Sequence, residues 1–179
     1  MDKEIIVFVG GPSSGKTTLI NALKSAGHIC YPEISREIIK EAQKNGVDQL
    51  FLKEPLYFSE LLLQGRIKQY QDALKEESDI VFLDRGIPDV LAYMNYIGDT
   101  YPKSFSETCK NYKYTKVFIL PPWEAIYTSD EERYENYEQA LLIYNHLKET
   151  YSYFGYNLIE IPKDSIENRV AFVTEQISI

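Results

Sequence analysis

The stretch that decides the fold is Gly10-Gly11-Pro12-Ser13-Ser14-Gly15-Lys16-Thr17-Thr18. It fits the pattern G-x-x-x-x-G-K-[ST] at every fixed position. Residues 4–9 before it form an apolar, β-branched run that predicts a buried strand, and residues 18–24 after it predict a helix. A strand, a glycine loop and a helix in this order are the setting in which the pattern forms a phosphate-binding loop, and they disfavour a chance Gly/Ser-rich turn.

Each residue type in this loop has a defined chemical use. Gly10 and Gly15 let the backbone turn, so that successive N–H groups point into one concavity at a helix N-terminus, where an anion is favoured. Lys16 adds a cation for the outer phosphates, and the Thr17 hydroxyl is a ligand for Mg²⁺. Residues 10–18 are therefore predicted to bind a nucleoside triphosphate, taken here as ATP, with Mg²⁺. The loop does not tell what happens to the γ-phosphate.

Composition bounds the class of protein. The 179 residues suffice for one domain, which we expect to span residues 1–179. Lys and Arg number 19 against 27 Asp and Glu, a net charge of −8 without a basic cluster, so nucleic acid is not an expected partner. The longest apolar runs have strand length, and the N-terminus leads straight into the first strand, so neither a membrane partner nor a signal peptide is expected.

The two cysteines, Cys30 and Cys109, lack metal-binding spacing and are expected to be reduced in a cytoplasmic protein. The two histidines, His28 and His146, are isolated and receive no role. The sequence leaves the oligomeric state open, a homodimer included.

Apolar runs alternate with helical patterns along the rest of the chain. Further strands are predicted at residues 28–32, 80–83, 116–120 and 156–161. Helices are predicted at residues 33–42, 55–77, 87–97, 132–154 and 165–177, while the stretch 99–115 indicates a helix plus a mobile loop. This alternation predicts an α/β fold, a three-layer sandwich around a five-stranded parallel sheet.

Polar residues follow the third predicted strand, at the sheet edge where ligands gather in such folds. Asp84 comes directly after four apolar residues and is a candidate ligand for Mg²⁺ or a proton acceptor, the alternative being a helix cap or a solvated turn residue. Arg85 is a candidate for holding a phosphate or a carboxylate, the alternative being a salt bridge that orients Asp84.

Two further candidates follow the second and fourth strands. Glu33 is a candidate general base, with Arg36 one helical turn later; the alternative is a first-turn acid in an i, i+3 ion pair. Arg133 lies in a charged segment after the fourth strand, within a lid expected near residues 121–135, and would stabilise charge on the γ-phosphate. Its alternative is an exposed arginine at a helix start.

Several blocks besides the phosphate loop occur in the order of a known family. The chain resembles the small standalone ATPase domain family usually labelled AAA-type, which is similar to nicotinamide-riboside kinase domains and, more distantly, to deoxynucleoside and thymidylate kinases. The resemblance covers nearly the whole chain. The blocks that carry it are residues 10–18, 31–36, 82–89, 121–124, 130–133 and 155–162.

The resemblance implies an adenylate-kinase-like sheet with strand order 2-3-1-4-5. It places Asp84 near Thr17 and the metal, and it turns Glu33 and Arg85 toward an acceptor. It also implies that Arg133 belongs to a lid and that the loop over residues 162–165 touches the nucleotide base.

The residues are compatible with two functions of different classes. The first is a nucleoside- or nucleotide-type kinase that transfers the γ-phosphoryl group of Mg·ATP to a hydroxyl or phosphate of an unidentified small molecule. The second is a nucleotide-dependent NTPase or switch module that acts through a protein partner. No Asp-x-x-Gly follows the third strand and no Asn-Lys-x-Asp is present, which disfavours a GTPase. The sequence leaves open whether Asp84 or Glu33 is the base.

Overall fold

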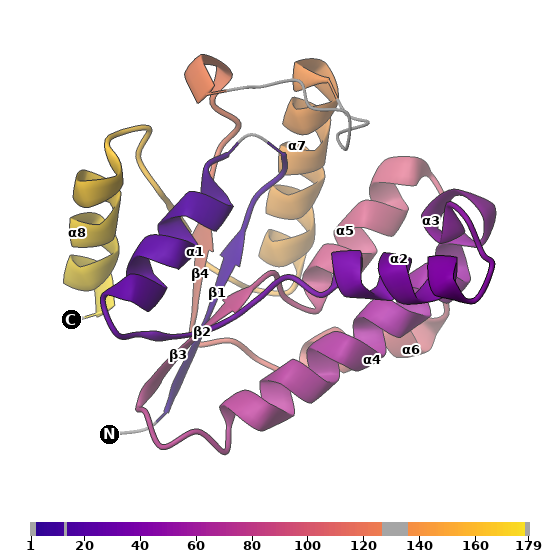
Figure 1. Cartoon of the computed structure of the whole chain (residues 1–179), viewed down its shortest axis with the longest axis horizontal. Helices are drawn as coiled ribbons and strands as arrows, with labels where there is room; N and C mark the ends of the chain where they lie inside the picture. Colours follow the sequence, from indigo (N-terminus) through magenta and orange to yellow (C-terminus); the bar gives the residue numbers. More distant parts are fainter. Residues whose placement is uncertain (1–2, 13, 127–135, 178–179) are drawn as a thin grey trace.

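A parallel sheet organises the molecule. The computed structural model describes residues 3–12, 14–126 and 136–177. Its sheet has the order β2-β3-β1-β4-β5, and every neighbouring pair of strands is parallel (Figure 1). This confirms the predicted fold class and strand order. The strands are β1 (Glu4–Val9), β2 (Ile29–Tyr31), β3 (Ile80–Asp84), β4 (Lys116–Ile119) and β5 (Leu158–Glu160).

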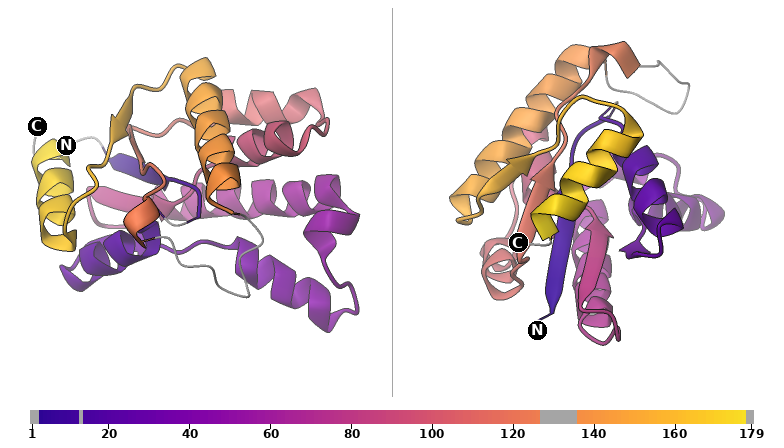
Figure 2. Two further views of the ribbon diagram at one scale, coloured as in Figure 1. Left: turned by 90° about the horizontal axis from the view of Figure 1, so that it is seen from above. Right: turned by 90° about the vertical axis from the view of Figure 1, so that its left-hand side faces the viewer.

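Helices cover both faces of the sheet (Figure 2). One face carries α1 and α8, and the other carries α4, α5 and α7. The helices are α1 (Lys16–Ser25), α2 (Ser35–Lys44), α3 (Leu50–Lys53), α4 (Pro55–Ala73), α5 (Pro88–Ile97), α6 (Lys103–Asn111), α7 (Tyr137–Tyr153) and α8 (Ile166–Ile177), with a 3₁₀ turn, η1 (Glu124–Ile126).

Apolar residues on both faces of the central strands explain this layering. On the α1/α8 face, Phe8 of β1 packs between Phe82 and Phe118 of the neighbouring strands, with ring centroids 5.3 and 5.2 Å away. On the opposite face, Val7 and Leu83 pack in a cluster that includes buried residues of α4, α5 and α7. Strands buried on both faces read as continuous apolar runs, which is why β1, β3 and β4 could be recognised from the sequence.

A third apolar cluster lies beside the sheet and joins α3, α4, α5 and α6, with α2 packed against it. In Figure 1, α2 and α3 extend to the side of the sheet opposite α8. Leu50 of α3, Phe58 of α4 and Phe105 of α6 are almost fully buried in this cluster. It supports the segment between β2 and α2 that carries Glu33.

Some predicted boundaries were wrong, for local reasons. The helix predicted from residue 132 begins at Tyr137, because the side chain of Asn136 accepts a hydrogen bond from the Gln139 N–H and caps it there. The long helix α4 ends at Ala73 rather than at residue 77. The short helix α3 was not predicted, and α6 is the helix within the stretch 99–115. Residues 127–135, most of the predicted lid, lie outside the described residues.

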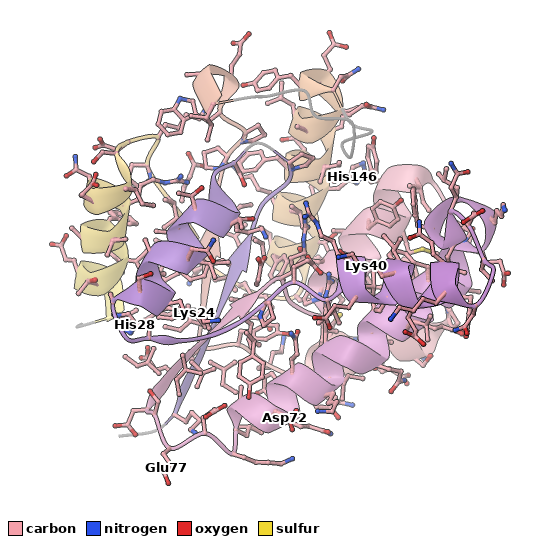
Figure 3. The ribbon with its side chains drawn as sticks, in the orientation of Figure 1. Lys24, His28, Lys40, Asp72, Glu77 and His146 are labelled. Carbon is pink, nitrogen blue, oxygen red and sulfur yellow. The ribbon has the colours of Figure 1, made fainter. Side chains whose placement is uncertain are left out.

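No described helix is long and apolar enough to cross a membrane. The two histidines lie in different parts of the molecule, His28 before β2 and His146 on α7 (Figure 3). Each contacts an aromatic ring, His28 that of Phe82 and His146 that of Tyr96. They therefore act as packing residues.

Candidate functional site

The phosphate loop joins β1 to α1 at the carboxyl edge of the sheet. Gly15 directly precedes α1 with φ +74°, a left-handed conformation that favours glycine. Gly10 lies so close to β4 that an added Cβ would be 3.0 Å from the Leu120 carbonyl oxygen. The Ser14 hydroxyl donates a 3.0 Å hydrogen bond to the Gly11 carbonyl and fixes the turn. Ser13, another predicted loop residue, lies outside the described residues.

Lys16 and Asp84 come together at this edge. Phe8 of β1 stands opposite Asp84 of β3 in the parallel register, so the backbone ladder places Asp84 beside the loop. The Lys16 ammonium forms an ion pair with the Asp84 carboxylate, and both side chains are buried. Burial, and next the nearby charge of Arg85, lower the pKa of Lys16, while Asp84 opposes that shift. The structure thus brings together a cation and a carboxylate that are 68 residues apart in sequence.

The donor set at this edge fits Mg²⁺. Thr17, the second residue of α1, offers a hydroxyl oxygen and Asp84 a carboxylate oxygen, the hard ligands that this ion prefers. Among residues 3–12, 14–126 and 136–177 there is no group of three or more His, Cys, Asp or Glu side chains that could hold a metal. A Mg²⁺ ion held by one or two protein oxygens, waters and phosphates needs no such group.

Glu33 is held between two arginines. Its Oε1 accepts hydrogen bonds from the N–H groups of Ile34 at 2.9 Å and Ser35 at 3.0 Å, and it lies 3.4 Å from Nη2 of Arg66. Its Oε2 is paired with Arg85. The ion pairs of Glu33 therefore run to β3 and α4, and not to Arg36 as the i, i+3 alternative supposed.

Electrostatics keep Glu33 ionised. Burial alone would raise its pKa, but the charges of Arg66, Arg85 and Lys16 and the Ser35 N–H outweigh burial and lower the pKa to about 2. The free protein thus presents a permanent carboxylate at the end of β2. It is a good acceptor for a hydroxyl proton in a hydrogen bond and a weak base.

Arg85 is fixed in an unusual backbone conformation. Its φ is +73°, which costs a non-glycine residue about 1 kcal/mol, and its N–H donates to the Phe8 carbonyl at 2.9 Å. The guanidinium pairs with Glu33 and, at 3.3 Å, with Asp89. Burial alone would lower its pKa, but the negative charges of Glu33, Asp89 and Asp84 raise it. The predicted alternative, a salt bridge that orients Asp84, is replaced by these two pairs.

The Arg85 guanidinium is held in place by the buried carboxylate of Asp89. Asp89, in the first turn of α5, accepts hydrogen bonds from the Gly86 N–H at 2.9 Å and from the Tyr151 hydroxyl at 2.6 Å. Burial, and next the charge of Asp89, raise the pKa of Tyr151 well above its ordinary value, so the hydroxyl stays a donor. A Cβ at position 86 would lie 2.6 Å from that hydroxyl and 2.8 Å from Tyr114, so only glycine fits.

Arg66 completes the cluster and was not predicted from the sequence. It lies on α4, is 4% exposed, and donates through Nη1 to the Gly86 carbonyl at 3.0 Å. Leu56 at the start of α4 and Leu74 just after its end are exposed. The buried residues of α4 are Phe58, Ser59, Leu62, Leu63, Arg66, Gln69 and Ala73. A charged residue at helical spacing among Phe58 and Leu62 was the available signal.

Arg133 lies outside the described residues, so its role in a lid stays a prediction. On α7, Tyr144 and Tyr151 are packed, whereas Leu141 is 41% exposed.

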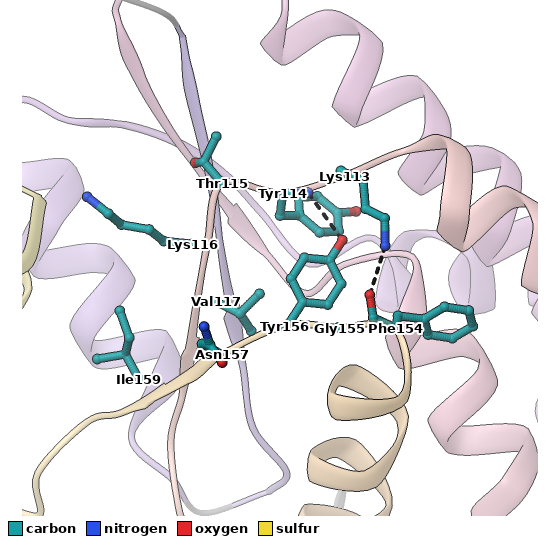
Figure 4. Close-up of a pocket in the computed structure, with 10 residues that line it drawn as sticks. All are labelled: Lys113, Tyr114, Thr115, Lys116, Val117, Phe154, Gly155, Tyr156, Asn157 and Ile159. Atoms are coloured by element: carbon teal, nitrogen blue, oxygen red, sulfur yellow. Dashed lines mark hydrogen bonds between the residues drawn. The ribbon is translucent and has the colours of Figure 1, made fainter.

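A separate hollow lies near the start of β4 and the loop that leads to β5 (Figure 4). Two hydrogen bonds join residues of its lining: Lys113 Nζ donates to the Phe154 carbonyl at 2.8 Å, and the Tyr114 N–H donates to the Tyr156 hydroxyl at 3.2 Å. The phosphate loop follows the other, carboxyl ends of these parallel strands. This hollow is therefore not part of the candidate site.

Comparisons with known proteins identify the family and the fold. A family model described as an AAA domain matches residues 5–169. A comparison with curated proteins finds no match. A phosphate loop in this fold implies nucleotide binding.

Among solved structures, the chain is similar to a NadR protein in complex with NR, with TM-score 0.76 and 18% identity over 99% of this chain and 52% of that chain. It thus spans about half of NadR. It is also similar to deoxyadenosine kinase from M. mycoides with products dCMP and dCDP bound, with TM-score 0.68 and 14% identity over 97% of this chain and 98% of that chain. A third similar structure is thymidylate kinase from Candida albicans, with TM-score 0.67 and 16% identity over 99% of this chain and 92% of that chain. At these identities the likeness shows the fold alone.

Proposed function

Because the chain belongs to the AAA-domain family and carries a complete phosphate loop, we propose that it is an ATP-dependent kinase of a small molecule of the nucleoside type. The observation that carries the proposal is the convergence of three strand ends. The loop after β1, Glu33 after β2, and Asp84 and Arg85 at the end of β3 meet at one edge, joined by ion pairs. That edge offers a phosphate site next to a carboxylate that is held between Arg66 of α4 and Arg85.

In the proposed reaction, an acceptor hydroxyl attacks the γ-phosphorus. The new bond joins the acceptor oxygen to phosphorus, the bond between the γ-phosphorus and the β,γ-bridging oxygen breaks, and ADP leaves. Lys16 neutralises charge on the phosphates, and Arg85 orients the acceptor beside Glu33, which accepts the hydroxyl proton. Bound Mg²⁺, held by Thr17 and Asp84, would neutralise phosphate oxygens.

We assign the proton to Glu33 rather than to Asp84 because Asp84 is paired with Lys16. A carboxylate with a pKa of about 2 takes up a proton only late in the transfer. Late proton transfer suits the loose transition state of phosphoryl transfer, in which the nucleophile has formed little bond to phosphorus.

The balance of charges favours a hydroxyl acceptor over a phosphate acceptor. A phosphate acceptor brings about two negative charges and needs cations that are not already neutralised. Lys16, Arg66 and Arg85 each have a carboxylate partner. The pairs are Lys16 with Asp84, Arg66 with Glu33, and Arg85 with Glu33 and Asp89.

The test is turnover of Mg·ATP by the purified protein with a panel of nucleosides, other small alcohols and nucleoside monophosphates, read by mass spectrometry for a product heavier by one phosphoryl group. We expect a product from a nucleoside-type alcohol, lost in Lys16→Ala and strongly reduced in Glu33→Gln. A product from a monophosphate alone would refute the hydroxyl acceptor. Nucleotide binding with only slow hydrolysis across the panel would refute the kinase and favour a switch module.

A further inference from the structure

Arg169 is a buried cation that the proposed reaction does not use. It lies in the first turn of α8, 155 residues from the phosphate loop in sequence, and is 4% exposed. Burial lowers its pKa. Within residues 3–12, 14–126 and 136–177, no carboxylate forms an ion pair with it.

Its contacts are with the phosphate loop. Nη2 donates a 2.9 Å hydrogen bond to the Ser14 carbonyl. Nη1 lies against Gly15, where an added Cβ would collide with it. Nε is buried and has no hydrogen-bond partner among the described residues. The guanidinium carbon lies 6.0 Å from the centre of the Trp123 ring, which is partly exposed.

A buried guanidinium without an anion is costly. One backbone carbonyl and one aromatic ring compensate only part of the lost hydration. By contrast, Lys16, Arg66 and Arg85 each have a carboxylate partner. The charge of Arg169 and its unused N–H groups therefore indicate a negative ligand at the α8 side of Gly15, and the ligand that this loop binds is a chain of phosphates.

We propose that Arg169 binds a phosphate group of the nucleotide from the α8 side of the loop, and that the nucleotide is its counter-ion. The inference rests on the proposed nucleotide binding but not on phosphoryl transfer. Because Trp123 covers the guanidinium, binding changes the surroundings of that ring. Trp123 is the single tryptophan of the chain, so its fluorescence reports the event.

The test compares the full chain with Arg169→Met and Arg169→Lys, and with Lys24→Met, which removes an exposed cation from α1, as the matched control. Binding of Mg·pyrophosphate and Mg·ATP is measured by calorimetry and by Trp123 fluorescence, and thermal unfolding is followed without ligand. Pyrophosphate probes the phosphate contact alone, since it has no base or ribose.

We expect Arg169→Met to weaken pyrophosphate binding about tenfold or more and to abolish the fluorescence change, while the melting temperature without ligand stays equal or rises. Arg169→Lys should recover part of the affinity, because it keeps the charge. The inference would be overturned if Arg169→Met lost clearly less than about tenfold in pyrophosphate affinity, or if Lys24→Met lost as much affinity as Arg169→Met, whatever the melting temperature. If Arg169→Met does not fold, Arg169→Gln, which also removes the charge, takes its place, and a loss of affinity below about threefold in Arg169→Gln counts against the role.

Failure of the wild-type chain to bind pyrophosphate or ATP would instead overturn nucleotide binding itself. Binding without any phosphorylated product would overturn only the kinase. The three outcomes are therefore distinguishable.

Discussion

Glu33 makes stability depend on pH at the acidic end. Its pKa falls from an ordinary 4.5 to about 2 in the folded protein, so its contribution to stability is complete above about pH 4.5 and is lost as the pH falls toward 2. We expect Glu33→Gln to lower the free energy of unfolding by about 1–3 kcal/mol near neutral pH. Near pH 3 the difference from wild type should be smaller.

Urea unfolding of both proteins at the two pH values measures this difference. A gap between wild type and Glu33→Gln that stays constant or widens in acid would contradict the assigned pKa. Glu41→Gln, on the exposed face of α2, is the matched control. Its free energy of unfolding should equal that of wild type at both pH values.

Tyr151 acts on Arg85 through Asp89. Tyr151→Phe removes the 2.6 Å hydrogen bond to Asp89 and should cost about 1–2 kcal/mol of stability. If the protein is a kinase, the KM for the acceptor should also rise, because Arg85 is held less firmly, while the affinity for Mg·ATP stays the same. Denaturant unfolding and steady-state kinetics measure the two effects. Tyr153→Phe, on the same helix but 77% exposed, should change neither; a similar loss there would refute the role of Tyr151.

Residues of the site differ in how far the sequence alone revealed them. Lys16 lies in a pattern with fixed spacing, and Asp84 follows an apolar strand, so local context pointed to both. Arg66 and Asp89 lie inside helices, where a charged residue is usually solvated, and their partners are distant in sequence. Only the packed structure shows that their side chains turn inward. Local patterns carry no information on such long-range pairs.

At the scale of elements, the start of α7 depends on one cap. Asn136 accepts from the Gln139 N–H at 2.9 Å, and the Gln139 side chain accepts from the Asn136 N–H at 2.8 Å. Asn136→Ala should cost about 1 kcal/mol, a fall of roughly 2–4 °C in melting temperature. Asn136→Asp keeps the acceptor and should stay near wild type. Calorimetry of the three proteins checks this; equal melting temperatures for Asn136→Ala and Asn136→Asp would count against the cap.

All five strands were predicted, the short and half-buried β2 included, whereas the short helix α3 was not. β1, β3 and β4 are continuous apolar runs, and their bounds were found to within a residue. β5 at the sheet edge is only three residues long, and the predicted strand was longer because the residues on either side of it also have a strand-like sequence. α3 is a single turn, too short to show a helical period. The fold class thus followed from the central strands.

At the scale of the whole molecule, stability should be uneven. α2 has no fully buried residue, whereas α1 buries Lys16, Leu19, Ile20 and Leu23 against the sheet. Backbone amides of α2 should therefore exchange with solvent at least about tenfold faster than those of α1. A non-hydrolysable ATP analogue with an acceptor should slow exchange in α2 more than the analogue alone, because the proposed acceptor site lies against Glu33.

Hydrogen exchange followed by mass spectrometry measures this directly. Equal protection of α1 and α2 in the free protein would contradict the uneven stability. Slowing by the analogue alone, with no further effect of any acceptor, would contradict the acceptor site beside α2.

The strand register that sets Phe8 opposite Asp84 fixes the position of Asp84 relative to the phosphate loop. Main-chain hydrogen bonds between β1 and β3 fix the spacing of loop and carboxylate, so that spacing does not depend on which side chains fill the helices beside the sheet. Helices α2, α3 and α6 share one apolar cluster that lies apart from the clusters under the sheet. If the protein is a kinase as proposed, substitutions in that cluster would reshape acceptor recognition and leave phosphate binding unchanged, so that few mutations would suffice for a new substrate.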